Sequence, residues 1–121
     1  MTKRILVVED QEDNRQILRD LLSNAGYDMI EAEDGVQAIV AASQHRPDLI
    51  LMDIQLPTLD GYEATRRIKA NPALAAIPII VVTSYALSGD EDKAREAGCD
   101  AYVAKPYSPR ALLAKIREYL P

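Results

Sequence analysis

Residues 48–61 read Asp-Leu-Ile-Leu-Met-Asp-Ile-Gln-Leu-Pro-Thr-Leu-Asp-Gly, and this stretch decides the fold. Its apolar run, residues 49–52, is typical of a strand buried on both faces of a parallel sheet. Asp53 follows at the point where that strand leaves the core. Pro57 then stops strand pairing, and Asp60-Gly61 indicates a turn. Because ligands of open α/β sheets bind beyond the carboxyl ends of the strands, Asp53 is the first candidate functional residue.

On both sides of this stretch, short apolar runs alternate with segments of helical periodicity. The expected strands are 5–8, 27–32, 49–53, 77–82 and 101–104, and the expected helices are 11–25, 36–46, 62–70, 90–97 and 109–120. This alternation predicts an α/β fold, in which a doubly wound five-stranded parallel sheet carries helices on both faces. The length suits one domain, residues 1–121.

The helical periodicity also predicts which side chains face the sheet. We expect Ile17, Leu18, Leu21, Leu22 and Ala25 to point inward from the first helix, Val36, Ile39, Val40 and Ala42 from the second, and Leu112, Leu113, Ile116 and Leu120 from the last. Gly26 is the expected stop of the first helix. Ser108 is the expected N-cap of the last, with Pro109 at its first position.

The composition excludes several classes of protein. Apolar residues make up 48% of the 121 residues, with six Tyr and neither Phe nor Trp, so the core must be mainly aliphatic. A net charge of −5 argues against non-specific binding to nucleic acid or to an anionic membrane. A single cysteine, Cys99, excludes an internal disulfide framework and favours a cytoplasmic setting. The first apolar segment is too short for a signal sequence or a membrane span.

Polar side chains follow four of the expected strands: Glu9 and Asp10, Asp53, Thr83, and Lys105. Each has a plainer explanation when it is considered alone. Asp10 could be only a helix N-cap, Thr83 a strand-end hydroxyl, and Lys105 a surface lysine. Their coincidence at one edge of a parallel sheet favours a shared site.

Electrostatics predicts what that site binds. Two carboxylates about 4 Å apart repel by roughly 4 kcal/mol at an effective dielectric constant near 20. Lys105 can neutralise part of this charge, and a hard divalent cation can neutralise most of it. We expect Mg²⁺, with Mn²⁺ as an alternative, held by Asp10, Asp53 and the backbone carbonyl of Gln55, with Glu9 acting through water. Such a site would handle phosphoryl groups.

With these residues in place, the chain resembles response-regulator receiver domains of the single-domain type over essentially its whole length. The matching motifs are Val-Val-Glu9-Asp10, residues 48–57 with Asp60-Gly61, Val-Thr83-Ser84, Ala-Lys105-Pro106, and residues 89–102. The resemblance implies a flavodoxin-like (CheY-like) sheet of strand order 2-1-3-4-5.

The resemblance also implies a phosphorylation switch. Asp53 would accept a phosphoryl group from a histidine of a sensor kinase or a histidine phosphotransfer protein. Asp10, Asp53 and the Gln55 carbonyl would hold Mg²⁺, with Glu9 in the acidic pocket. Lys105 would pair with the phosphoryl oxygens, and Thr83 would donate a hydrogen bond to one of them.

Further expectations come from the same resemblance. The bond before Pro106 would be cis. Tyr102 would be the switch aromatic on the face formed by the fourth helix, fifth strand and fifth helix, where a downstream protein would dock. Gln55 and Tyr85 would tune the lifetime of the phosphoryl group, and a bulky Tyr85 would slow its hydrolysis.

Two other kinds of protein place a functional site at the strand ends of such a sheet, and the sequence departs from both. A Mg²⁺-dependent phosphatase with a strand-end Asp nucleophile needs a second Asp two residues later, where this chain has Gln55. A flavodoxin-like cofactor binder needs a phosphate-binding loop after the first strand, where Glu9-Asp10 would repel the phosphate. We therefore expect a signalling receiver that catalyses only its own phosphorylation and dephosphorylation. The start at Met1 and the lack of a linker favour a single-domain protein, monomeric or weakly dimeric, over a receiver module of a hybrid kinase.

Overall fold

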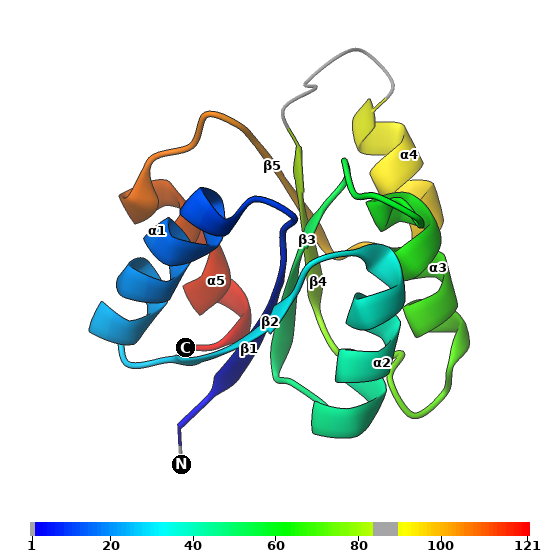
Figure 1. The fold of residues 1–121 in the computed structure, drawn as a ribbon, viewed down its shortest axis with the longest axis horizontal. Helices are drawn as coiled ribbons and strands as arrows, with labels where there is room; N and C mark the ends of the chain where they lie inside the picture. Colours follow the sequence, from blue (N-terminus) through cyan, green and yellow to red (C-terminus); the bar gives the residue numbers. More distant parts are fainter. Residues whose placement is uncertain (1, 84–89) are drawn as a thin grey trace.

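The chain forms a parallel sheet between two layers of helices in a computed structural model, which describes residues 2–83 and 90–121 (Figure 1). The strands are β1 (Arg4–Val8), β2 (Asp28–Ala32), β3 (Leu49–Asp53), β4 (Ile79–Thr83) and β5 (Ala101–Ala104). The helices are α1 (Glu12–Asn24), α2 (Gly35–His45), α3 (Gly61–Ala70), α4 (Asp90–Ala97) and α5 (Pro109–Tyr119). The strand order β2-β1-β3-β4-β5 confirms the predicted topology.

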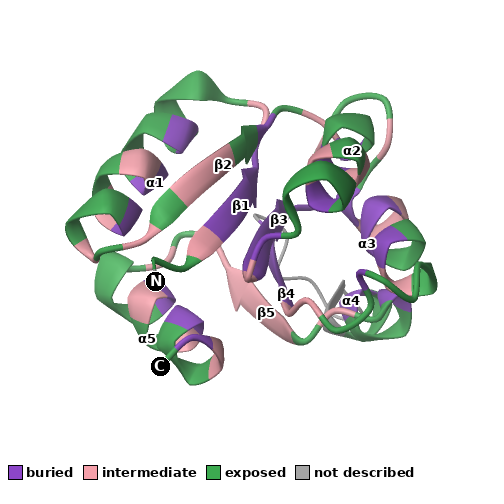
Figure 2. Ribbon diagram, turned by 90° about the horizontal axis from the view of Figure 1, so that it is seen from below, coloured by how far each residue is buried: buried purple, intermediate pink, exposed green. Residues whose placement is uncertain are grey.

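The three central strands are the buried middle of the molecule, and the two edge strands are only partly covered (Figure 2). Every residue of β3 and β4 is buried. Alternate side chains enter two separate cores, because successive strand residues point to opposite faces. Leu6 and Val8 pack on the side of α2, α3 and α4, while Ile5 and Val7 pack on the side of α1 and α5.

Three of the side chains expected to point inward are exposed. Ile17 of α1 is 59% exposed, and Val36 and Val40 of α2 are 46% and 48% exposed. The buried stripe of α2 consists instead of the small residues Gly35, Ala38 and Ala42. The two predictions for α2 were wrong because α2 is apolar on more than one side, so periodicity alone could not identify the face that packs.

Side chains cap the N-terminal ends of three helices, including the predicted cap Ser108. The side chains of Asp34, Asp60 and Ser108 each accept a hydrogen bond from a backbone N–H in the first turn of α2, α3 and α5. Gln11, and not Asp10, occupies the N-cap position of α1, where its side chain makes no capping hydrogen bond. The plain explanation of Asp10 as an N-cap is therefore wrong.

Some expectations concern residues outside the described ranges. Ser84 of the sequence motif and Tyr85, expected to tune phosphoryl lifetime, both lie there. Among the described residues, no helix combines the length and the apolar character needed to cross a bilayer.

Candidate functional site

The carboxyl edge of the sheet gathers three acidic side chains from two strands. Carboxylate oxygens of Glu9, Asp10 and Asp53 all lie within 4.8 Å of one another. Glu9 and Asp10 follow the last residue of β1, and Asp53 ends β3, which is the neighbour of β1 in the sheet. The cleft that they line has a volume of about 380 Å³, and Gln11, Asn14, Gln55 and Lys105 complete its wall.

Glu9 is buried, 4% exposed, and both of its carboxylate oxygens accept hydrogen bonds. Its Oε1 accepts from Asn14 Nδ2 at 3.2 Å and from Lys105 Nζ at 3.2 Å. Its Oε2 accepts from the backbone N–H of Gln11 at 3.2 Å. A buried charge needs such partners, so this carboxylate is held in one orientation.

Asp53 is 8% exposed and is held from two sides. Its Oδ1 accepts from the backbone N–H of Gln55 at 3.1 Å, and its Oδ2 accepts from Lys105 Nζ at 3.2 Å. Gly61 permits this geometry, because a Cβ at that position would lie 2.1 Å from the Asp53 carbonyl oxygen. The loop after β3 can therefore close directly against the backbone of Asp53.

Lys105 is the cation that bridges the buried acids, with its ammonium 3.2 Å from both Glu9 and Asp53. Burial by itself would lower the pKa of Lys105, but attraction to Asp53 and Glu9 outweighs it and raises that pKa above the usual value. The backbone N–H of Lys105 donates to the Thr83 carbonyl at 2.7 Å. The Lys105–Pro106 peptide bond is cis, as the resemblance implies.

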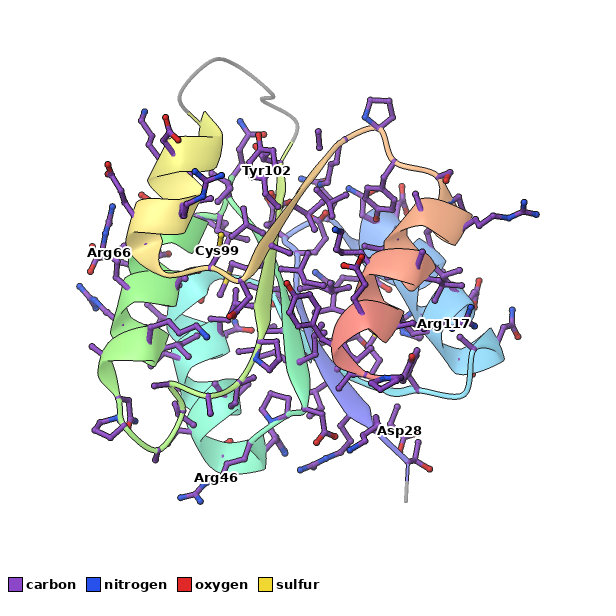
Figure 3. The ribbon with its side chains drawn as sticks, turned by 180° about the vertical axis from the view of Figure 1, so that it is seen from behind. Asp28, Arg46, Arg66, Cys99, Tyr102 and Arg117 are labelled. Carbon is purple, nitrogen blue, oxygen red and sulfur yellow. The ribbon has the colours of Figure 1, made fainter. Side chains whose placement is uncertain are left out.

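Thr83 is the last residue of β4, and Tyr102 is the second residue of β5. Thr83 is 1% exposed and directly follows Val82, the residue that pairs with Asp53 in the sheet. Tyr102 is half-buried and packs with Cys99 against the core on the α4 side of β5 (Figure 3). Thr83 thus reaches the same sheet edge as Asp53.

Two residues that contact the site were not singled out from the sequence. Asn14 donates to the Glu9 carboxylate, as described above. Arg15 is only 6% exposed and donates to the Glu9 backbone carbonyl at 2.7 Å. Its position three residues before Leu18 and seven before Leu22 places it on the buried stripe of α1. A charged residue on an apolar stripe was the sequence signal that could have identified it.

The donor set fits Mg²⁺. All three side chains offer carboxylate oxygens, the ligand type that this cation prefers. Oxygens bound to one octahedral Mg²⁺ lie about 3 Å apart on adjacent corners and about 4 Å apart on opposite corners, given bonds of about 2.1 Å. The observed separations are at most 4.8 Å, so side-chain movements of about 1–2 Å would satisfy this geometry.

Comparison with known proteins gives consistent matches. Residues 5–117 match the family model described as response regulator receiver domain. The polar-differentiation response regulator DivK of Brucella ovis is 45% identical over 120 residues, which cover 99% of this chain and 98% of DivK.

Several solved structures have closely similar folds. The receiver domain of a sensor histidine kinase from Pseudomonas aeruginosa has a TM-score of 0.92 and 38% identity, with 99% of this chain and 98% of that chain covered. That structure has a magnesium ion coordinated in its active site cleft. A putative response regulator from Chloroflexus aurantiacus has a TM-score of 0.94 and 28% identity, with the same coverage of 99% and 98%.

Proposed function

The chain belongs to the response regulator receiver family of two-component signalling systems, and on that premise we propose that Asp53 is its phosphoacceptor. The phosphoryl donor is a phosphohistidine of a sensor histidine kinase or of a histidine phosphotransfer protein. The observation that carries this proposal is the setting of Asp53. Its carboxylate lies 3.2 Å from the Lys105 ammonium, in a cleft with two further acids.

In the proposed reaction, a carboxylate oxygen of Asp53 attacks the phosphorus atom. The P–N bond to the donor imidazole breaks, the imidazole leaves with the electron pair, and an acyl phosphate forms on Asp53. Phosphoryl transfer depends mainly on positioning and charge stabilisation. The Gln55 N–H and Lys105 position Asp53, and Lys105 neutralises phosphoryl charge, while Thr83 donates a hydrogen bond to a phosphoryl oxygen.

Asp10, Asp53 and the backbone carbonyl of Gln55 would hold Mg²⁺ in this cleft. Glu9 would act through water, because its two oxygens already accept three hydrogen bonds from the protein. When bound, the cation supplies Lewis-acid neutralisation of charge on the phosphoryl oxygens. The magnesium ion in the Pseudomonas aeruginosa receiver domain supports this assignment.

The proposed readout lies on the face formed by α4, β5 and α5. Tyr102 on β5 is the switch aromatic, and it moves inward when Thr83 shifts toward the phosphoryl group. A downstream protein binds this face in one of its two states, which is the logic of a switch biased by a local charge. The hydrogen bond from Lys105 N–H to the Thr83 carbonyl, 2.7 Å long, supports coupling between the ends of β4 and β5.

We assign residues 1–121 to one receiver domain that is cytoplasmic and monomeric or weakly dimeric. The half-buried free thiol of Cys99 suits a reducing compartment. The same domain could act alone or as a module of a hybrid kinase. The 45% identity to DivK supports the first context, and the 38% identity to a receiver domain of a sensor histidine kinase supports the second.

Incubation with acetyl phosphate and Mg²⁺ tests the phosphoacceptor. The unmodified protein should gain one phosphoryl group by intact-mass measurement, and the group should be lost in acid and base as expected of an acyl phosphate. Asp53→Asn should gain none. Asp13→Asn, which removes an exposed carboxylate of α1, is the matched control and should be labelled normally. Labelling of Asp53→Asn at the unmodified rate would refute the assignment.

A further inference from the structure

Arg15 is a buried cation on α1 that the proposed chemistry leaves without a role. Its side chain is 7% exposed, and its guanidinium has four acceptors. These are the carboxylates of Glu12 at 2.5 Å, Glu31 at 3.2 Å and Glu33 at 3.2 Å, and the backbone carbonyl of Glu9 at 2.7 Å. Guanidinium is suited to such a position because its donors form a rigid planar fork.

The contact with Glu9 fixes a peptide at the edge of the acidic cleft. The Glu9 N–H donates to the Ala32 carbonyl at 3.0 Å, so that side of Glu9 is tied to β2. The Glu9 carbonyl belongs to the peptide plane that also contains the N–H and Cα of Asp10. A donor that orients this carbonyl therefore also sets the direction in which the chain enters Asp10.

Asp10 depends on this support more than the other two acids do. Glu9 and Asp53 are buried, and hydrogen bonds hold their carboxylates, whereas Asp10 is more exposed than either. Among the described contacts, the Asp10 carboxylate accepts a 3.3 Å hydrogen bond from the exposed side chain of its neighbour Gln11. The location of the Asp10 carboxylate is thus set mainly by its backbone.

We propose that Arg15 is a positioning residue for the cation site, acting through the Glu9 carbonyl on the Asp10 backbone. This inference rests on the proposed function, since it takes the acidic cleft to bind Mg²⁺. Outer-shell hydrogen bonds of this kind orient metal ligands, and their removal typically weakens metal binding by about 10- to 100-fold. Glu12, Glu31 and Glu33 balance the charge of Arg15 and hold its guanidinium in place.

Arg19 provides a matched control. It donates to Glu12 at 3.4 Å and to Glu31 at 2.6 Å, so it belongs to the same ionic network. Among the described contacts, however, only Arg15 of the two arginines reaches the Glu9 carbonyl. Arg15→Met and Arg19→Met remove the same charge from nearly the same place, but only Arg15→Met removes the hydrogen bond to that peptide.

Isothermal titration calorimetry with Mg²⁺ alone tests the inference on the unmodified protein, Arg15→Met and Arg19→Met. The dissociation constant of Arg15→Met should rise by about 10-fold, the lower end of the range for outer-shell partners. That of Arg19→Met should stay within about twofold. Far-UV circular dichroism at the titration temperature establishes that each variant is folded. If Arg15→Met does not fold, Arg15→Lys is titrated in its place, and its Mg²⁺ dissociation constant should also rise.

A spectroscopic measurement separates positioning from a general loss of stability. In the folded protein without metal, the Glu9 carbonyl ¹³C and Asp10 amide ¹⁵N resonances should shift in Arg15→Met or Arg15→Lys and remain in place in Arg19→Met. Equal Mg²⁺ affinities for all variants, or equal weakening by both Met variants, would overturn the positioning role. Absence of Mg²⁺ binding by the unmodified protein would instead refute the proposed cation site, and with it this inference.

Discussion

Replacement of Lys105 by Met should destabilise the protein without metal by about 3 kcal/mol. Carboxylate oxygens within 4.8 Å of one another repel by about 3.5 kcal/mol per pair at an effective dielectric constant of about 20. The three pairs of Glu9, Asp10 and Asp53 thus give roughly 10 kcal/mol of repulsion on this scale. The Lys105 ammonium lies 3.2 Å from Glu9 and from Asp53, and each attraction is worth about 5 kcal/mol on the same scale.

Attraction and repulsion in the cleft therefore nearly cancel, and Met in place of Lys105 leaves the repulsion uncompensated. Loss of one partner of a buried ion pair typically costs about 3–5 kcal/mol. The Lys105 side chain is 24% exposed, so water offsets part of the loss, and the lower end of this range is expected. Mg²⁺ in excess should restore most of the lost stability, because it neutralises the same carboxylates.

Urea unfolding followed by far-UV circular dichroism, at neutral pH and with a chelator present, measures this effect. Lys115→Met is the matched control, because in the described part of the chain Lys115 pairs with Glu118 on the exposed side of α5. Its unfolding free energy should change by less than about 1 kcal/mol. The reasoning is refuted if Lys105→Met is as stable as Lys115→Met, or if Mg²⁺ stabilises Lys105→Met no more than the unmodified protein.

Three further predictions concern the pH dependence of stability, the packing at Gly61 and the hydrogen bonds of Lys69. The unfolding free energy should fall as pH rises above about 10.4, the ordinary pKa of lysine. The pKa of Lys105 is raised in the folded protein, so the stability from its charge is complete below the unfolded pKa and is lost as pH rises through the folded pKa. The variant Tyr107→Phe should show the same fall in unfolding free energy. Gly61→Ala should cost about 3 kcal/mol by overpacking and weaken Mg²⁺ binding in calorimetry, because its Cβ would lie 2.1 Å from a backbone oxygen of β3. Gly26→Ala, with open space but φ of 89°, should cost only about 1 kcal/mol and leave Mg²⁺ affinity unchanged. Lys69→Met should lower the urea midpoint of unfolding and cost about 2 kcal/mol. The reason is that the Lys69 ammonium donates to two loop carbonyls at 2.7 and 3.1 Å. Labelling of this variant by acetyl phosphate should persist.

Local patterns were enough to predict the elements and much of the site. The bounds of α4, Asp90–Ala97, and of β5, Ala101–Ala104, match the prediction to the residue. Both elements carry sharp local signals, a polar helix closed by Gly98 and a short apolar run before Lys105-Pro106. The acids and the lysine were predicted to meet because parallel strands place their carboxyl ends at one edge of a sheet.

The faces of the helices were harder to predict. Ile17 is one position away from the buried Leu18, and rotation by one residue on a helix turns a side chain by about 100°. In α2, the apolar residues Val36 and Val40 point to solvent, while Ala38 and Ala42 pack against the sheet. Small residues allow close approach of the helix, and that advantage depends on the surface opposite, which no local pattern contains.

The sequence by itself determined the α/β class, the order and approximate positions of the helices and strands, and the acidic residues at the strand ends, because these depend on periodicity and turn chemistry within a few residues. Only the tertiary structure decided which donors hold those acids. Lys105 and Glu9 meet across 96 residues of chain, and Arg15 of α1 meets Glu31 on β2 and Glu33 just after it. Such contacts depend on how the helices lie on the sheet, and their distances set the charge balance of the cleft.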